Sequence, residues 1–478
     1  MLNEWIKDMT NWFKYDTKAI CLFCLCLLLS LPSYSNQSTI INKIKLLEDD
    51  FKSLSSEFYQ DASSYSDTSL QKITDINLLL IKVNKLNASN NSISAIQLIY
   101  FNLDMVKDNL DTEAVFDIME LLLDKNEWNL ANSLFRTIKD DGDKSLLATV
   151  QFLFAKYHAQ RNEWNQVNKL LEGNFAELSE ENAAYAYLLN GSALQHLKKH
   201  RQAVSNYNKI KATSQYYNYA QLNTAIANIR QGWWTDAQLK IRSLIKEYNK
   251  NNEDELTNRL YLVLGYALLQ REYYRDARQA FRNIGLNSRY TNRALLGIGL
   301  TATSQGDYIG GLNALTILKD KKTFDLSVDE SYLLVPYIYE KLQQENTVTS
   351  TYSEAMSYYQ KRIKLLNNIS NRHSNIFSLE YDKNTSSFII QNNSLDYGNK
   401  FPESFIKNFH KLNELNKASS NIEIKNKITG LTKKYDSIFQ EIIKDLTSKR
   451  EEYLKSYLNQ SRYGLARLYD SSSEASDQ

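Results

Sequence analysis

Apolar residues recur at helical spacing along most of the chain, and the pattern is clearest between Asn258 and Leu315. A run of large apolar residues around Gly265 is followed by a polar turn and then by Ala277. The same order returns 34 residues later, with Gly299 and Gly311 in the corresponding positions. Small residues at these points allow two antiparallel helices to approach closely, and large residues three, four and seven positions away share one helical face. The pattern predicts consecutive helix pairs.

Four columns of residues repeat with this period between residues 111 and 365. Taking one small residue of each second helix as reference gives spacings of 36, 36, 34, 40 and 34 for Ala131, Val167, Ala203, Ala237, Ala277 and Gly311. Four residues after each reference stand Phe135, Leu171, Tyr207, Ile241, Phe281 and Leu315. Three before stand the rings of Trp128, Trp164, His200, Trp234, Tyr274 and Tyr308, which we interpret as packing toward the next pair. Twelve before stand Met119, Ala155, Gly191, Ala225, Gly265 and Gly299.

A seventh, distorted unit is expected from Tyr332 to Ile363. Its first helix contains Pro336, which removes a backbone hydrogen bond and so marks a kink or a helix start. A linker over residues 343–352 is expected next, followed by a second helix carrying Ala355 and Tyr359 in the repeating columns. About seven units therefore fill residues 111–365.

This helix–turn–helix pattern resembles the tetratricopeptide repeat (TPR), whose repeats of about 34 residues stack their apolar faces into one core. The resemblance implies an all-α fold, a right-handed superhelical solenoid of antiparallel helix pairs, with first helices lining the inner face. Carried over by column, that face comprises Tyr185, Leu188, Tyr219, Leu222, Ile226, Leu262, Tyr266, Leu296 and Leu300. These residues would form a groove for an extended peptide or a partner helix, or else belong to the half-buried core.

The N-terminal residues have the sequence pattern of an export signal. Lys14 and Lys18 precede a 13-residue apolar run over Ala19–Leu31, and small residues follow up to Ser35. This order is typical of a secretory signal, and the run is short for a membrane span. We expect residues 1–35 to be a signal peptide cleaved after Ser35, and the protein to be periplasmic. An uncleaved anchor in the inner membrane, facing the periplasm, is the alternative, and translation from Met9 is also open.

Outside the repeats, four segments complete the domain organisation. Residues 36–110 are helical without a clear repeat and are expected to form an N-terminal region or cap. Residues 366–424 are polar and irregular, with a short hairpin near Phe377 and Phe388. Residues 425–470 predict one long amphipathic helix, which either caps the solenoid or binds a partner. Residues 471–478 are expected to be a disordered tail.

Composition and motifs argue against catalysis. The three cysteines all lie in the N-terminal apolar run, and no phosphate-binding glycine loop, nucleophile elbow or zinc-protease motif occurs. His196 and His200 stand four apart but have no third metal ligand nearby in the sequence. A net charge of +2 gives no general attraction to nucleic acid. We therefore expect a protein that is not an enzyme and has no catalytic residue, cofactor or metal.

One charged cluster is prominent. Arg271, Arg275, Arg278 and Arg282 follow the second helix of the clearest unit, and the last three share a face. This arginine stripe is either a solvated outer surface or a site for an anionic partner, such as a lipid head group or an acidic protein patch.

The functional expectation is an exported scaffold that mediates protein–protein interactions in the assembly or regulation of a cell-envelope complex. The whole arrangement, including the ending from Ser461 to Asp470, also resembles uncharacterised exported TPR proteins of Gram-negative bacteria. The alternative is a regulatory or glycan-binding module for a cell-wall or polysaccharide enzyme. No nucleic acid is expected as a partner.

Overall fold

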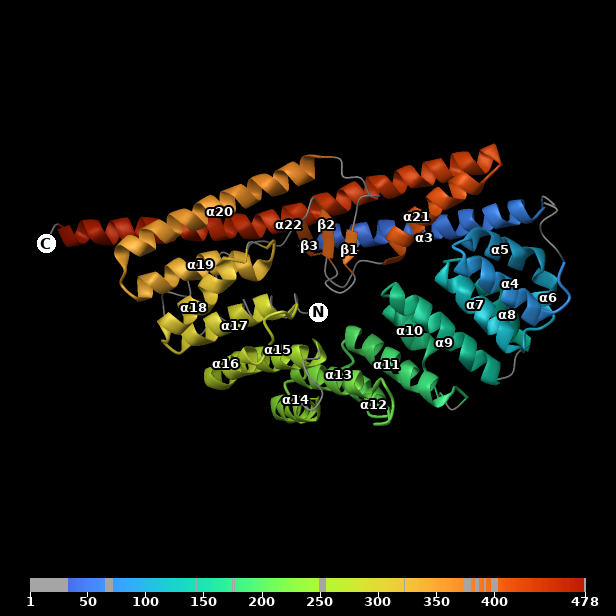
Figure 1. Ribbon diagram of the computed structural model, residues 1–478, viewed down its shortest axis with the longest axis horizontal. Helices are drawn as coiled ribbons and strands as arrows, with labels where there is room; N and C mark the ends of the chain where they lie inside the picture. Colours follow the sequence, from blue (N-terminus) through green and yellow to red (C-terminus); the bar gives the residue numbers. More distant parts are fainter. Residues whose placement is uncertain are drawn as a thin grey trace. The chain divides into compact units, whose positions relative to one another are not determined.

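The computed structural model describes residues 33–64, 72–141, 144–173, 175, 177–248, 255–321, 323–372, 380–382, 387–390, 393–396 and 403–476. Most of these residues are helical (Figure 1). The helices before the strands are α3 Ser33–Ser64, α4 Ile76–Ala88, α5 Ser92–Phe101, α6 Leu103–Lys107, α7 Glu113–Asp124, α8 Trp128–Asp141, α9 Lys144–Gln160, α10 Trp164–Leu170, α11 Glu180–His196, α12 His200–Tyr207, α13 Tyr217–Arg230, α14 Trp234–Tyr248, α15 Glu255–Gln270, α16 Tyr274–Arg282, α17 Thr291–Ser304, α18 Tyr308–Lys319, α19 Leu326–Lys341 and α20 Glu345–Asn371. Strands β1 Glu380–Asp382, β2 Ser387–Ile390 and β3 Asn393–Asp396 follow, and then helices α21 Glu403–Ala418 and α22 Ile422–Ser476.

One turn recurs between the two helices of each pair. Its central residue lies in the left-handed region, with φ between 56° and 78°, at Asn90, Asn126, Asn162, Lys198, Gly232, Glu272, Gly306 and Gln343. The N–H of the next residue donates to the carbonyl five positions earlier, at 2.7–3.1 Å in every case. This is the hydrogen bond of a Schellman turn, which satisfies the end of the first helix. The second helix begins one residue later, so the turn sets the same register in each pair.

The recurring turn gives eight helix pairs in the described residues. It adds one pair before the predicted repeats and changes the predicted bounds of the last pair. Asn90 marks an additional pair, α4 and α5, within the region where no repeat was assigned. In the last pair, α19 begins at Leu326 and contains Pro336, and the turn lies at Gln343. The expected linker over residues 343–352 is therefore wrong, since α20 begins at Glu345. Two features obscured this pair in the sequence: the proline within a helix, and Thr and Ser at the start of α20.

Close packing within the pairs follows the predicted columns. The Phe281 ring lies between Gly265 and Gly297, where an added Cβ on either glycine would come within 2.5 Å of ring carbon. The same relation joins Gly191 to Tyr207 and Gly299 to Leu315. A larger residue at the glycine positions would push the buried side chain out of place.

The ring column packs toward the following pair, as the spacing predicts. Trp128 contacts Phe154 and Tyr157 of α9, with ring centroids 5.0 and 4.8 Å apart. Trp164 stacks on His196 of α11 at 4.1 Å. These aromatic rings fill the space between neighbouring pairs, and their role is structural.

The chain divides into two compact units that are discontinuous in sequence. Unit 1 consists mainly of residues 228–401 and 440–478, and unit 2 consists of residues 39–227 and 402–439. Helix α22 therefore contributes its first part to unit 2 and its second part to unit 1.

In unit 2, the C-terminal segment packs on the turn between α7 and α8. The Asn126 side chain accepts a hydrogen bond from Tyr157 at 2.6 Å and one from Arg161, and donates to Asn408 of α21 at 2.6 Å. Asn408 in turn donates to the Tyr435 hydroxyl of α22 at 3.3 Å. Asn126 is consequently buried, with 5% of its surface exposed. One asparagine thus adopts the left-handed turn conformation and links three helices.

In unit 1, the second part of α22 covers the last helix pair. Arg450 forms an ion pair with Asp329 of α19, and Tyr457 donates to Glu330 at 3.2 Å. A Cβ on Gly464 would lie 2.5 Å from the Tyr352 ring of α20, so α22 approaches that helix closely. Burial raises the pKa of Glu330 to about 7, although the Tyr457 hydrogen bond lowers it. The contacts support the predicted capping role for the end of the chain in this unit.

The region between the repeats and α22 is more ordered than expected. Strands β1, β2 and β3 form an antiparallel sheet in that order, with Tyr381 opposite Phe388 and Phe388 opposite Leu395. The four-residue spacing of Phe405 and Phe409 places both rings in the core and explains helix α21. Helix α22 continues to Ser476, further than predicted, since no proline or glycine interrupts its last 12 residues.

The N-terminal predictions lie almost entirely outside the described residues. These include the apolar run Ala19–Leu31 and the alternative start at Met9, whereas the bond after Ser35 lies near the start of α3. Across the helices that the structure describes, none combines the length and apolarity needed to span a membrane.

Candidate binding surfaces

The first-helix residues predicted to form a groove separate into two groups by burial. Five keep part of their surface accessible: Tyr185, Leu188, Tyr219, Ile226 and Leu300. Of these, Tyr219 on α13 is the most exposed, at 51%. Four of the five belong to unit 2, on α11 and α13.

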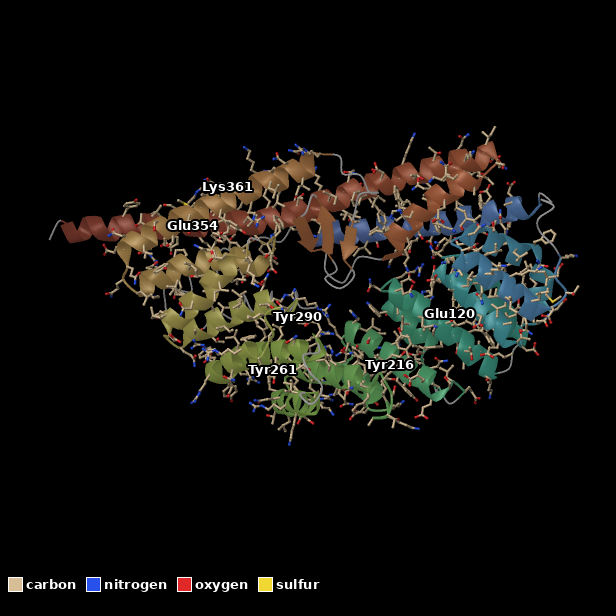
Figure 2. All side chains as sticks on the ribbon, in the orientation of Figure 1. Glu120, Tyr216, Tyr261, Tyr290, Glu354 and Lys361 are labelled. Carbon is tan, nitrogen blue, oxygen red and sulfur yellow. The ribbon has the colours of Figure 1, made fainter. Side chains whose placement is uncertain are left out.

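An aromatic cluster forms the centre of the accessible group. The Tyr185 ring stacks on Tyr216 at a centroid distance of 4.8 Å and meets the edge of Phe152 at 5.9 Å. Tyr216 stands immediately before α13, beside α11 (Figure 2). Burial raises the pKa of both Tyr185 and Tyr216 above the usual value of tyrosine, so both hydroxyls stay protonated into alkaline solution and can donate a hydrogen bond. The cluster offers ring faces and hydroxyl groups on one surface.

The remaining four predicted groove residues are core residues. Leu222 and Leu262 are 1% exposed, Tyr266 is 4% exposed and Leu296 is 7% exposed. The Tyr266 hydroxyl donates to the carbonyl of Arg293 at 3.0 Å and its ring meets the edge of Phe281 at 4.9 Å. Within unit 1 the first helices α15, α17 and α19 are consecutive neighbours, so side chains on their flanks fill the space between them. Of the two alternatives left open by the sequence, groove or core, these four residues therefore fit the core.

The four residues of the arginine stripe also differ in their exposure and in their partners. Arg278 forms an ion pair with Asp307 at 2.6 Å, and Asp307 also accepts a hydrogen bond from the Gly310 amide at 2.9 Å. That amide and Arg278 lower the pKa of Asp307. Arg271 lies over the Trp234 ring, 4.7 Å from its centroid. Arg271, Arg275 and Arg282 are exposed, and Arg278 is half-buried.

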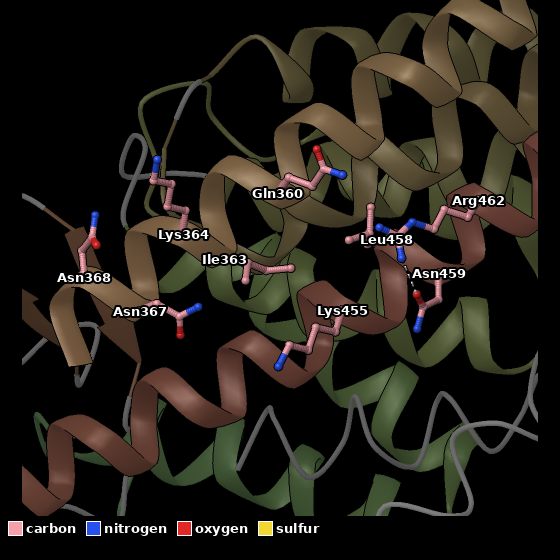
Figure 3. Close-up of a pocket in the computed structure, with 9 residues that line it drawn as sticks. All are labelled: Gln360, Ile363, Lys364, Asn367, Asn368, Lys455, Leu458, Asn459 and Arg462. Atoms are coloured by element: carbon pink, nitrogen blue, oxygen red, sulfur yellow. Dashed lines mark hydrogen bonds between the residues drawn. The ribbon is translucent and has the colours of Figure 1, made fainter. Parts of the chain in front are cut away.

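A groove between α20 and α22 was not anticipated from the sequence (Figure 3). It belongs to unit 1 and encloses about 510 Å³. Its lining comes from two segments about 90 residues apart: Gln360, Ile363, Lys364, Asn367 and Asn368 on α20, and Lys455, Leu458, Asn459 and Arg462 on α22. The cations Lys364, Lys455 and Arg462 are visible in the sequence, but nothing there indicated that the two helices face each other.

The described residues show no metal-binding constellation. No three His, Cys, Asp or Glu side chains among them gather closely enough to hold an ion. His196, half of the candidate histidine pair, stacks face to face with Trp164.

Comparisons with known proteins add little beyond this geometry. No protein-family profile matches the chain, and no curated protein matches it in sequence. Among solved structures, the apo form of RapI aligns with a TM-score of 0.44 and 13% identity, covering 76% of this chain and 97% of RapI. The apo form of the quorum sensor NprR from B. thuringiensis aligns at 0.35 and 11%, covering 74% and 99%. The APC/C heterotetramer Cut9–Hcn1 aligns at 0.31 and 16%, covering 59% and 52%.

The chain itself has the TPR-like architecture that the sequence predicts, a solenoid of antiparallel helix pairs with a long C-terminal helix. The similarity to solved structures is too distant to carry a conclusion about binding.

Proposed function

We propose that the protein is an exported, non-enzymatic scaffold that binds a protein partner in the cell envelope. The observation that carries the proposal is the partly accessible stack of Tyr185 on Tyr216, from consecutive repeats, together with the exposed Tyr219 on α13. Tyrosine gives a large contact area and a hydroxyl group at a small cost in conformational entropy, which suits a protein interface. Leu188 and Ile226, also partly accessible, extend the same first-helix surface.

Export rests on the N-terminal sequence pattern of basic residues, apolar run and small residues. The proposed location is the periplasm, with an inner-membrane anchor as the alternative. Mass analysis of the protein purified from its host tests this directly. A mature N-terminus at Asn36 is expected, and a protein that retains Met1 or Met9 in the cytoplasm would contradict export.

Site-specific photocrosslinking tests the binding surface. A photoreactive phenylalanine analogue at position 219 is expected to form a discrete adduct with a protein of the envelope fraction. The same analogue at position 239 on second helix α14, where Leu239 is 63% exposed, is the control and should not form that adduct. Tyr185→Ala in the position-219 variant should weaken the adduct.

Equal adducts at both positions would show non-specific contact and contradict the proposal. Recovery of glycan without any protein would instead favour the glycan-binding alternative. Arg275 and Arg282, the two exposed members of the arginine stripe that do not lie over an aromatic ring, are proposed as a secondary contact for an acidic patch on the partner.

A further inference from the structure

The groove between α20 and α22 has a chemical character that the first-helix surface does not share. Lys364 on one wall and Lys455 and Arg462 on the other give it three cationic groups, and no carboxylate is among its lining residues. The whole chain carries a net charge of only +2. The groove is therefore a local surplus of positive charge.

Nearby ion pairs cancel only part of this surplus. Lys455 is paired with Glu451 at 2.8 Å, and Asn367 donates weakly to the same carboxylate at 3.4 Å. Lys364 and Arg462 are exposed, and neither forms an ion pair within the described part of the chain. Some other cations of unit 1 have acidic partners, such as Lys319 with Glu354 at 2.7 Å and Arg467 with Glu340. Two cations in the groove thus remain available to a ligand.

The rest of the lining suits a polypeptide backbone. Gln360, Asn367, Asn368 and Asn459 supply four carboxamides, and each carries donors and an acceptor that match a peptide group. Ile363 is half-buried and Leu458 is 7% exposed, so the groove has an apolar floor for an occasional aliphatic side chain.

The dimensions fit a short extended segment. The α20 wall runs from Gln360 to Asn368, which at a rise of about 1.5 Å per residue is roughly 12 Å long. An extended chain covers that length with about four residues. The charges are distributed along both walls, as a row of carboxylates on an extended segment would require.

We propose that the α20–α22 groove binds an extended acidic segment of a partner protein, with carboxylates on Lys364 and Arg462 and backbone groups on the carboxamides. A phosphate group is a poorer match, because the groove lies away from the N-terminus of both helices and offers no free backbone N–H groups. A lipid surface is a poorer match as well, because the aliphatic residues form the floor instead of projecting from the rim.

Fluorescence anisotropy with the purified full chain tests the proposal. The probe is a labelled ten-residue peptide that alternates Glu with Leu and Ser, compared with peptides in which every Glu becomes Gln or Lys. The acidic peptide is expected to bind at least tenfold more tightly than the Gln peptide, and to lose affinity as salt is raised. Equal binding of the Glu and Gln peptides would overturn the proposal.

Charge reversal localises the binding. Lys364→Glu combined with Arg462→Glu should weaken binding of the acidic peptide at least tenfold and strengthen binding of the Lys peptide. Both side chains are exposed, and unchanged thermal unfolding checks that the fold is retained. The matched control is Lys433→Glu, an exposed position of α22 in unit 2, which should leave binding unchanged.

Three outcomes would contradict the proposed binding of an acidic segment in the groove. An equal loss in the Lys433→Glu control would indicate general charge attraction and overturn the groove as the site. Displacement of the peptide by millimolar inorganic phosphate but not by chloride would identify a phosphate site, and stronger binding to phosphatidylglycerol vesicles than to peptide would identify a lipid surface. The measurements use purified protein and defined peptides, so they are independent of export and of the first-helix surface.

Discussion

At the scale of single residues, Glu127 shows how this chain places ionisable groups in its interior. It follows the left-handed Asn126, is 1% exposed, and accepts hydrogen bonds from Ser55 at 2.6 Å and Tyr100 at 2.8 Å. Burial raises the pKa of Glu127 from 4.5 to about 7, while Ser55, Tyr100 and Lys411 lower it. The folded protein therefore binds a proton at Glu127 that the unfolded chain releases between these two pH values.

The sign of the pH dependence follows from that difference. Between about pH 4.5 and 7 the folded state holds more protons at this site, so the site's contribution to stability falls as pH rises and is constant above pH 7. We predict that Glu127→Gln stabilises unit 2 at pH 8 by up to roughly 3 kcal/mol and changes it little at pH 5. Hydrogen exchange of the α7 and α8 amides at both pH values measures the effect.

Glu120→Gln is the control for this pH effect. Its side chain belongs to the same unit but is 55% exposed, and the substitution should have an effect below about 1 kcal/mol at either pH. An equal change for Glu127→Gln at pH 5 and pH 8 would contradict the assigned proton.

Residue-level prediction from the sequence succeeded where neighbours are local. Gly265 against Phe281 and Trp164 toward the next pair follow from repeat spacing alone. The burial of Asn126 did not follow, because its partner Asn408 is 282 residues away in the sequence. The choice between groove and core stayed open for the nine candidate groove residues for a different reason: column position gives the helix face but not how closely neighbouring elements cover it.

At the scale of elements, the Schellman turn is the most regular feature of the repeats. Only two of its eight left-handed positions are glycine, and three others are asparagine. Lys198, Glu272 and Gln343 adopt the same conformation at a cost, because a Cβ in the left-handed region is crowded by the backbone.

Glu272→Gly is therefore predicted to stabilise unit 1 by roughly 0.5–1 kcal/mol, since glycine adopts a positive φ without strain. The matched control is Gln279→Gly, an exposed position seven residues later inside α16, which should destabilise by about 1 kcal/mol. Urea unfolding followed by tryptophan fluorescence compares the two. Destabilisation by both glycines would contradict the strain at Glu272.

The helix pairs with conventional small residues were predictable, and the irregular ones were not. The bounds predicted for the α19–α20 pair were displaced along the sequence, because Pro336 was taken as a kink or a helix start. In the structure Pro336 lies buried inside α19. The eight turns could have supplied the register, but their residues differ too much in type to be recognised as one column: Asn, Lys, Gly, Glu and Gln share only a backbone conformation.

At the scale of the whole molecule, α22 is a helix that contributes residues to both compact units. Its residues up to Phe439 belong to unit 2, and Gln440 onward belongs to unit 1. The sequence predicted a long helix at this position, but no local pattern indicated which earlier helices it contacts. For that reason the α20–α22 groove could not be predicted either.

We predict that a chain ending at Phe439 loses protection in unit 1 and keeps it in unit 2. Without Arg450 and Tyr457, the buried carboxylates of Asp329 and Glu330 lose their partners in α22, which costs about 3–5 kcal/mol. Hydrogen exchange should accelerate in α19 and α20 and remain slow in α9 and α11. A chain ending at Tyr469 is the control and should resemble the full protein; unchanged exchange in α19 after the longer deletion would contradict the capping role.

The contacts between α22 and α3 also bear on how the protein reaches its native state. Lys434 pairs with Asp50 at 2.9 Å across 384 residues, and Lys427 pairs with Glu57 at 2.6 Å across 370. Helix pairs with local contacts can form as soon as both helices exist, whereas α3 must wait for a segment made near the end of synthesis. Until then α3, whose Ile44 and Phe51 side chains are fully buried in the finished protein, lacks these ion pairs and the hydrogen bond from the Tyr435 hydroxyl to the Leu47 carbonyl. Newly made chains should therefore depend on a chaperone at α3 for longer than at any helix pair.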